Sequence, residues 1–398
     1  MDKRPFRCGF IFGAGVMLLL TIAALAWLVH RVGKSQQTPP LPDPVIRAQG
    51  PAVGDAALVE VLKPIRLKYK LPALAGAIVK SDGGIRLGAV GVRKAGTDVA
   101  VTLDDKWHLG SDTKAMTATV VASLVEQGKL TWETTLAEVF PDLASRFHPI
   151  FKKATIRQLL THQAGFSENL DWGKIAKQGT IPEQRIQSLI LATSAKPQYE
   201  LGGKTHYSNL GYVVAGAVIE RITGHSWEDA IRELLFDPLK MTTVGFGGMG
   251  TPGKLDQPWP HRAKAEPTSG NGPAVDNPPV MGPAGCVHCS LADWGKFIAD
   301  HLRGARGSPA LLKPESYAAL HTPPAGNNYA LGWLVTQRDW GGGTVLTHAG
   351  CNTMNFANVW IAPQRDFAVL VCINQGDDVA AKASDEAIGA LIRFCKVE

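Results

Sequence analysis

The stretch "WHLGSDTKAMTATVVASLVEQGKL", residues 107–130, places Ser111 three positions before Lys114 at the start of an apolar run. Residues three apart share one face of a helix, so the lysine amine can lie beside the serine hydroxyl. A serine becomes a nucleophile when a base takes its proton, and burial makes a neutral lysine available for that task. Chance alone gives about one Ser-x-x-Lys in a chain of this composition. The pair predicts nucleophilic catalysis only if further partners are present.

The expected place of Ser111 at the beginning of a helix supports this chemistry. The first backbone N–H groups of a helix have no partner within it, and the helix dipole favours negative charge there. An oxyanion formed when Ser111 attacks a carbonyl group could therefore be stabilised by the N–H of Ser111 itself.

A second motif, "THYSNLGYVVAG", places Tyr207 and Asn209 two positions apart, just before a helix expected to begin near Leu210. Composition predicts roughly 0.15 Tyr-x-Asn by chance, so this spacing is more informative than the first. A phenol beside a lysine can carry protons. The alternative is a core tyrosine followed by Asn209 as a helix cap.

A third motif, "VLTHAGCN", precedes a segment rich in aromatic and β-branched residues. A strand edge at this point could present His348 and one backbone N–H to the nucleophile. Single histidines are more often structural, and we interpret His108 and His162 in that way.

In this order, the three motifs closely resemble the serine β-lactamase and penicillin-binding-protein superfamily, especially the class C β-lactamase-related serine hydrolases. Ser111-Asp112-Thr113-Lys114 resembles its Ser-x-x-Lys, "YSN" its Tyr-x-Asn, and "HAG" its Lys/His-Thr/Ser-Gly. The resemblance covers about residues 55–395. Other segments that share it are "LLTHQAGF", "PAGCVHCSLADWGKF" and "YALGW".

The resemblance implies a role for each matched residue. Ser111 would form an acyl-enzyme, and Lys114 and Tyr207 would share proton transfer. The substrate-binding positions would be Asn209, His348 and Gly350. Asn209 would bind the acyl side of the substrate, and His348 would tune Tyr207 or the leaving group. The oxyanion hole would consist of the backbone N–H groups of Ser111 and Cys351.

The third motif departs from the pattern of lactam-active members, which generally have a lysine and a hydroxyl residue there. His348 is mostly neutral near pH 7 and Ala349 has no hydroxyl, so recognition of a substrate carboxylate is weakened. We therefore expect an esterase, amidase or peptidase that acts on a less anionic small-molecule or peptide-like substrate. The alternatives are a penicillin-interactive β-lactamase or D-Ala-D-Ala carboxypeptidase, and a non-catalytic sensor or scaffold.

The cysteines suggest a further feature of this region. Cys286 and Cys351 stand where related sequences usually have glycine, and we hypothesise a disulfide between them in an oxidising compartment. The alternative is a free, oxidisable thiol. "CVHC" at 286–289 lacks a second ligand pair, so no metal site and no cofactor are expected.

The N-terminus carries an export signal. After the basic "MDKRPFR", residues 8–29 contain no charge and are about long enough to cross a bilayer. We expect residues 1–29 to be an uncleaved membrane anchor that leaves the catalytic domain in the cell envelope, outside the cytoplasm. A signal removed after "ALA" at 24–26, giving a secreted protein, is the alternative. Residues 30–54 are proline-rich and predict a linker to a domain at 55–398.

The remaining sequence must supply the elements that position these residues. Segments 73–80 and 85–96 predict a hairpin, and the last strands and a closing helix fall after residue 329. A mostly helical region lies between them, with a Gly- and Pro-rich surface excursion at 247–283. These elements predict an α/β (α+β) fold of the β-lactamase/transpeptidase type, with an antiparallel sheet from both chain ends flanked by helices and a helical inserted subdomain. The net charge of +6 is spread along the chain without basic–aromatic clusters, so nucleic-acid binding is not expected. The sequence leaves the oligomeric state open.

Overall fold

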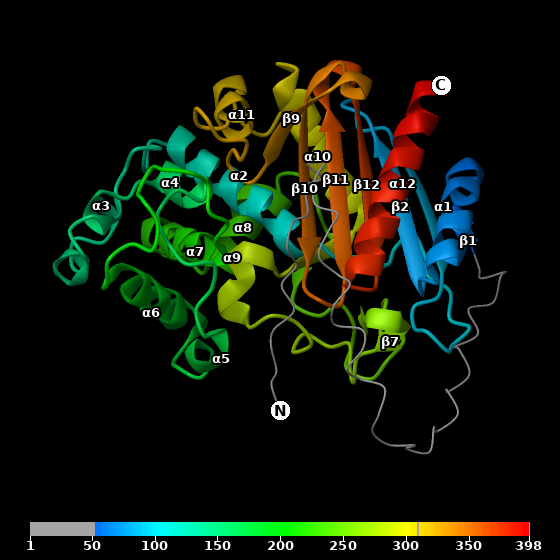
Figure 1. Ribbon diagram of the computed structural model, residues 1–398, viewed down its shortest axis with the longest axis horizontal. Coiled ribbons are helices and arrows are strands. Elements are labelled where there is room, and N and C mark those ends of the chain that lie inside the picture. Colours follow the sequence, from blue (N-terminus) through cyan, green and yellow to red (C-terminus); the bar gives the residue numbers. More distant parts are fainter. Residues whose placement is uncertain (1–51, 309, 398) are drawn as a thin grey trace, which may run out of the picture.

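A computed structural model describes residues 52–308 and 310–397, with an antiparallel sheet at its centre (Figure 1). Seven strands form this sheet in the order β1-β3-β2-β12-β11-β10-β9. Every neighbouring pair is antiparallel. The strands are β1 Ala52–Gly54, β2 Ala73–Val79, β3 Ile85–Gly91, β9 Leu334–Arg338, β10 Gly343–Cys351, β11 Phe356–Ala362 and β12 Phe367–Ile373. The predicted antiparallel sheet, built from both ends of the domain, is confirmed.

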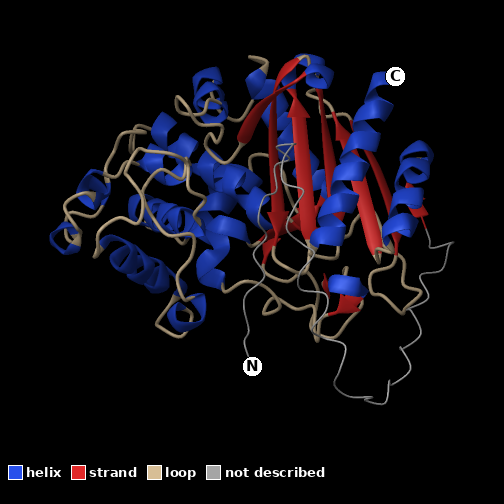
Figure 2. Ribbon diagram, in the orientation of Figure 1, coloured by secondary structure: helices blue, strands red, loops and turns tan. Residues whose placement is uncertain are grey.

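Helices cover both faces of the sheet, as Figure 2 shows. The first and last helices of the described chain pack on one face, and the larger helical part of the molecule lies on the other. The helices are α1 Ala56–Tyr69, α2 Thr113–Glu126, α3 Leu136–Val139, α4 Ile156–Leu160, α5 Trp172–Ile175, α6 Ile181–Thr193, α7 Asn209–Thr223, α8 Trp227–Ile231, α9 Gly282–Gly285, α10 Leu291–Ala305, α11 Pro314–His321 and α12 Asp378–Val397. The predicted helical insertion corresponds to the helices between β3 and α10.

Two smaller sheets complete the structure. One has the strand order β4-β8-β5 and holds the segment that leads to Ser111, and the other is the pair β6-β7. Their strands are β4 Lys106–His108, β5 Gly245–Phe246, β6 His261–Arg262, β7 Glu266–Pro267 and β8 Val287–Ser290.

Local sequence explains why the central strands and their flanking helices form. β2 and β12 are buried along their whole length, so both read as unbroken apolar runs, "ALAGAIV" and "FAVLVCI". Strands covered on both faces need apolar side chains on both. The helix expected after "HCS" is α10, and the Ser290 hydroxyl caps it by accepting a hydrogen bond from the backbone N–H of Asp293.

The structure differs from expectation at three places. β1 pairs with β3, so Ala52–Gly54, which lie inside the range expected to be linker, belong to the sheet. The segment 247–283 is not a mere surface excursion, because it buries side chains such as Trp259 and His261. "YALGW" is a loop, since β9 begins only at Leu334.

The expected anchor, residues 1–29, lies outside the described residues. Within 52–308 and 310–397, no helix combines the length and the apolar character needed to cross a bilayer.

Candidate active site

Ser111 lies in a 3-10 turn, Gly110–Asp112, that joins β4 to α2. The end of β10 packs directly against this turn. A Cβ atom added to Gly350 would lie 1.9 Å from the carbonyl oxygen of Leu109 and 2.7 Å from the backbone nitrogen of Ser111. The lack of a side chain at Gly350 therefore allows the strand to reach the serine.

The same close approach brings the two predicted oxyanion donors onto adjoining segments. A Cβ atom on Gly110 would lie 2.6 Å from the backbone nitrogen of Cys351. Gly110 has φ +50°, in the left-handed region that glycine adopts most readily. The backbone nitrogens of Ser111 and Cys351 thus lie on two closely packed segments, which allows both N–H groups to serve one developing oxyanion.

Lys114 projects from the first turn of α2 and is fully buried. Its Nζ lies 3.0 Å from Ser111 Oγ, 2.8 Å from Asn209 Oδ1 and 2.7 Å from the carbonyl oxygen of Ala284. A neutral amine has two N–H groups and one lone pair. It can donate to Asn209 and Ala284, whose oxygens accept only, while the lone pair receives the hydroxyl proton of Ser111.

The protonation of Lys114 suits a base. Burial lowers its pKa to about 7, although the neighbouring Asp112, Cys286 and Glu168 act in the opposite direction. Near neutral pH, a substantial fraction of the side chain is therefore uncharged.

Tyr207 donates its phenolic hydrogen to Ser111 Oγ over 2.7 Å, from the loop before α7. Its ring also lies 4.7 Å from Lys114 Nζ. Ser208 caps α7 by accepting a hydrogen bond from the Gly211 N–H. Because Ser208 provides the cap, the side chain of Asn209 is available to bind Lys114. The alternative of Asn209 as the cap is wrong.

The structure thus brings four predicted side chains together. Ser111 and Lys114 come from the turn before α2 and from its first turn, and Tyr207 and Asn209 come from the loop before α7 and from its first residue. Ser111, Tyr207 and Asn209 keep part of their surface exposed, while Lys114 has none. The Ser111 hydroxyl is thus accessible from solvent, whereas the Lys114 amine behind it is shielded from water.

His348 lies in the layer behind the nucleophile. Its Nε2 is 2.9 Å from the Tyr329 hydroxyl and its Nδ1 is 3.0 Å from the carbonyl oxygen of Ala349. A carbonyl oxygen only accepts, so Nδ1 carries the proton and Nε2 accepts from Tyr329. Burial lowers the pKa of His348 to about 3, so the ring is neutral. Both ring nitrogens are engaged by groups other than Tyr207, which was one of the two partners expected, the other being the leaving group.

Asp112 lies beside this histidine. One of its carboxylate oxygens is 3.6 Å from His348 Nδ1, beyond hydrogen-bond range, and neither oxygen has a hydrogen-bond partner. Burial raises the pKa of Asp112 well above its usual value, and the Lys114 charge opposes this only partly. Burial therefore favours the protonated form of this carboxyl.

His108 and His162, expected to be structural, both bond to the backbone next to predicted site residues. His108 Nδ1 accepts a hydrogen bond from the Gly110 N–H over 3.1 Å. His162 Nδ1 accepts one from the Ser208 N–H over 3.1 Å, and its ring packs 4.6 Å from the ring of Tyr207.

Sequence reasoning missed three residues of this site. Ala284 acts through its carbonyl oxygen, so the identity of its side chain gives no signal. Asn169 Oδ1 accepts a hydrogen bond from Asn209 Nδ2 over 3.0 Å and lies in a loop without a recognisable motif. Tyr329 falls in "YALGW", a segment that carried a resemblance but no assigned role.

The hypothesised disulfide between Cys286 and Cys351 is wrong, because Cys286 is a free, buried thiol. The packing of the two residues on opposite sides of the central sheet explains this outcome. Cys286 packs in the core on the α2 side of the central sheet, whereas Cys351 packs on the side of α1 and α12. The Cys351 sulfur accepts a hydrogen bond from the Thr353 N–H over 3.2 Å. Among the described residues, no group of three or more His, Cys, Asp or Glu side chains could hold a metal ion.

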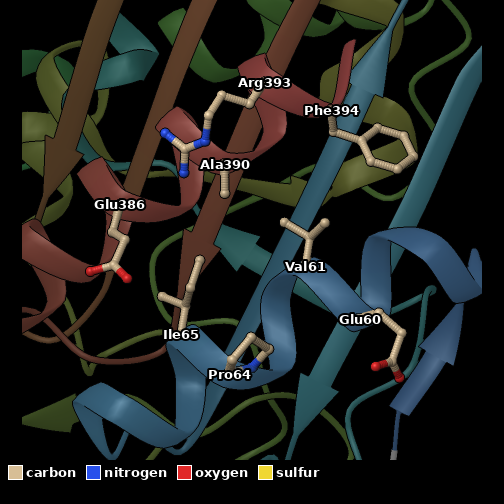
Figure 3. A pocket seen from close by; sticks show the side chains of 8 residues that line it. All are labelled: Glu60, Val61, Pro64, Ile65, Glu386, Ala390, Arg393 and Phe394. Carbon is tan, nitrogen blue, oxygen red and sulfur yellow. The ribbon is translucent and has the colours of Figure 1, made fainter. Parts of the chain in front are cut away.

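A groove of about 600 Å³ lies on the opposite side of the sheet, between α1 and α12 (Figure 3). Apolar side chains line it together with Glu60, Glu386 and Arg393. The lining contains no serine, cysteine or histidine, so the chemistry expected of Ser111 has no counterpart there.

Sequence similarity links this chain to known proteins. The Beta-lactamase family model matches residues 54–393. "Penicillin-binding protein 4" of Amycolatopsis lactamdurans is 28% identical over 340 residues, which are 78% of this chain and 83% of that protein. Two other relatives are matched over a smaller share of their own length, 58% and 62%.

Solved structures share the fold. A class C beta-lactamase from Rhodobacter sphaeroides superimposes with a TM-score of 0.66 at 19% identity, over 85% of this chain and 99% of that one. A D-stereospecific amidohydrolase from Streptomyces gives a TM-score of 0.64 at 23% identity, over 84% and 98%. At these identities, the likeness establishes the fold alone.

Proposed function

This chain belongs to the beta-lactamase family, and we propose that it is a serine hydrolase that cleaves an ester or amide bond through an acyl-enzyme on Ser111. One observation carries the proposal. Ser111 Oγ lies within hydrogen-bond distance of both Lys114 Nζ and the Tyr207 hydroxyl. A nucleophile, a base and a second proton carrier therefore meet at one partly exposed oxygen.

Acylation begins when neutral Lys114 takes the hydroxyl proton of Ser111. The oxygen attacks the substrate carbonyl carbon, and the negative charge that forms on the carbonyl oxygen is held by the backbone N–H groups of Ser111 and Cys351. The bond to the leaving group then breaks. The leaving alcohol or amine takes a proton from Tyr207, which regains one from the Lys114 ammonium.

Deacylation repeats these steps with water. The attacking water molecule gives up one proton, which passes to Lys114 with the help of Tyr207, and the water oxygen attacks the acyl carbon. When the ester bond to Ser111 breaks, the serine oxygen recovers its proton from Lys114. The free acid leaves, and the resting enzyme is restored.

The third motif supports a substrate without a carboxylate beside the scissile bond. His348 is neutral and engaged by Tyr329, and Ala349 offers no hydroxyl. Neither position supplies the cation or the donor that an anionic substrate needs. We infer a neutral, small-molecule or peptide-like ester or amide.

Turnover of a substrate panel by the full chain and by Ser111→Ala tests the proposal. We expect Ser111-dependent hydrolysis of short-chain p-nitrophenyl esters to exceed that of a chromogenic cephalosporin. The reverse order would favour a penicillin-interactive enzyme, the alternative suggested by the names of the relative from Amycolatopsis lactamdurans and of the structural neighbour from Rhodobacter sphaeroides. A fluorophosphonate probe that fails to label Ser111 in the folded protein would favour a non-catalytic sensor or scaffold.

The proposed location follows from the sequence before the domain. The uncharged residues 8–29, preceded by three basic residues, support a domain held outside the cytoplasm by an N-terminal anchor. Recovery of the full chain in a carbonate-washed membrane fraction, with the domain cleaved by external protease, is the expected result. Release of the intact domain into the medium would favour a cleaved signal.

A further inference from the structure

Asp276 places a buried carboxylate between two segments of the site. It belongs to the 247–283 segment, and its side chain is 0% exposed. One carboxylate oxygen lies 2.7 Å from His108 Nε2, and the other accepts a hydrogen bond from Asn352 Nδ2 over 2.8 Å. His108 lies just before the nucleophile, and Asn352 follows Cys351.

The first contact leads to Ser111. His108 Nδ1 accepts the Gly110 N–H, so the ring proton resides on Nε2 and is donated to Asp276. The carboxylate thereby fixes the ring, and the ring fixes the Leu109–Gly110 peptide, which directly precedes the peptide that carries the Ser111 N–H.

The second contact leads to Cys351. Asn352 Oδ1 accepts hydrogen bonds from the backbone N–H groups of Met354 and Asn355, over 3.2 and 2.8 Å. These bonds set the orientation of the side-chain amide, so its NH₂ group must face Asp276. The carboxylate thus holds the residue that follows Cys351.

We propose that Asp276 is a positioning residue that sets the distance between the two oxyanion donors, the backbone N–H groups of Ser111 and Cys351. The proposal rests on the function proposed above. The side chain at position 276 must accept a hydrogen bond at each of its two terminal atoms, because His108 and Asn352 each present an N–H group to it. An ionised carboxylate is such a group, whereas an amide has only one acceptor atom.

The electrostatics agree with this role. Burial raises the pKa of the Asp276 carboxyl, but its interactions with His108 and Asn352 outweigh burial and leave the pKa below its usual value. Asp276 therefore remains ionised at neutral pH. The hydrogen bonds to a buried charge are strongly directional, and besides His108 and Asn352 this carboxylate also interacts with the Asn277 backbone and the Cys286 thiol. Catalysis is sensitive to displacements of about 1 Å.

Asp276→Asn tests the proposal, because it sets an NH₂ group against one of the two N–H partners. We expect kcat for a p-nitrophenyl ester to fall about 10- to 100-fold, somewhat less than the loss of a whole oxyanion donor, with little change in KM. The preference for the ester over the matching thionoester should shrink as well. Sulfur is a poor hydrogen-bond acceptor, so this preference reports on the oxyanion hole rather than on overall stability.

Asn352→Asp provides a rescue. In Asp276→Asn/Asn352→Asp, the new amide can accept from His108 and donate to the new carboxylate, which still accepts from the backbone after it. We expect the double variant to regain most of the lost kcat and of the ester preference. Asn352→Asp alone places two carboxylates next to each other and should lower both kcat and the preference for the ester over the thionoester. If Asp276→Asn does not fold, this single variant carries the test.

Asp293→Asn is the matched control, since Asp293 is a buried carboxylate that accepts hydrogen bonds from Thr243, away from the site. It should lower the melting temperature without changing the ester-to-thionoester ratio. A wild-type ratio in Asp276→Asn or in Asn352→Asp, or a double variant no better than the singles, would overturn the positioning role. Absence of Ser111-dependent turnover in the wild type would instead overturn the proposed function, and this inference with it.

Discussion

The Tyr329 hydroxyl lies 2.9 Å from Nε2 of His348 and donates its proton to that nitrogen. This bond occupies the ring at the position where lactam-active relatives carry a lysine. The third motif therefore contributes a neutral imidazole whose two ring nitrogens both have hydrogen-bond partners within the protein. A charged group that affects hydrolysis must lie elsewhere in the site.

His348→Gln should leave the pH dependence of hydrolysis unchanged. Burial lowers the pKa of His348 to about 3, so the ring does not titrate between pH 5 and 9. We expect kcat/KM to fall less than about tenfold, as for loss of a packing contact and one hydrogen bond, whereas Ser111→Ala abolishes turnover. The measurement is kcat/KM as a function of pH for the wild type and for His348→Gln. A shift of the profile by one pH unit in His348→Gln would contradict the neutral ring.

Lys114 should govern the acidic side of that profile. Its pKa is lowered to about 7 by burial, and only the neutral amine accepts the Ser111 proton. Below pH 7, kcat/KM should thus fall about tenfold per pH unit, and above pH 7 it should approach a plateau. Lys114→Met should lose this dependence together with most of the activity. A wild-type profile flat from pH 5 to 8 would exclude Lys114 as the base.

Asp112→Asn should stabilise the protein increasingly as pH rises. A carboxyl whose pKa is raised by folding binds more protons in the native state, so wild-type stability is lost as pH climbs above the unfolded pKa of about 4. The amide has no such dependence. At pH 8, we expect a gain of about 1–3 kcal/mol in the free energy of unfolding, comparable to the cost of a buried polar group without a partner.

The measurement for Asp112→Asn is urea unfolding of both proteins at pH 5 and pH 8. The gain should be smaller at pH 5. The Asp112 charge raises the pKa of Lys114, so the substitution should also move the Lys114 limb of the activity profile to lower pH. A limb that stays in place would show that Asp112 does not act on Lys114 through its charge.

Much of the fold follows from short-range signals in the sequence. The unbroken apolar runs of β2 and β12 indicate strands covered on both faces, and Ser290 marks the start of α10. The Ser111–Lys114 contact is equally local, because three helical positions suffice to bring the two side chains together. These features need no knowledge of the tertiary structure.

The rest of the site depends on long-range geometry. The orientation of His348 is decided by Tyr329, and the failure of Cys286 to meet Cys351 is decided by the sheet faces that they occupy. Asp276 lies in a Gly- and Pro-rich segment whose composition suggests only a surface loop. Its role emerges only when the loop is seen to bury a carboxylate between β4 and the end of β10.

Gly350→Ala should destroy activity and lower stability together. The new methyl carbon would lie 1.9 Å from the carbonyl oxygen of Leu109 and 2.7 Å from the backbone nitrogen of Ser111, and both atoms belong to backbone that cannot rotate away. The strand must therefore withdraw from the turn, which separates the two oxyanion donors. We expect a loss of more than about 100-fold in kcat and about 1–3 kcal/mol in the free energy of unfolding.

Gly389→Ala is the control, because Gly389 lies within α12 and its added methyl carbon would meet only the flexible end of Arg393, at 3.5 Å. Alanine favours a helix interior over glycine by about 1 kcal/mol, so this variant should be more stable and equally active. The measurements are denaturant unfolding and ester turnover of Gly350→Ala and Gly389→Ala. A fully active Gly350→Ala would mean that β10 can move from the Ser111 turn without cost, and Cys351 could not then be an oxyanion donor.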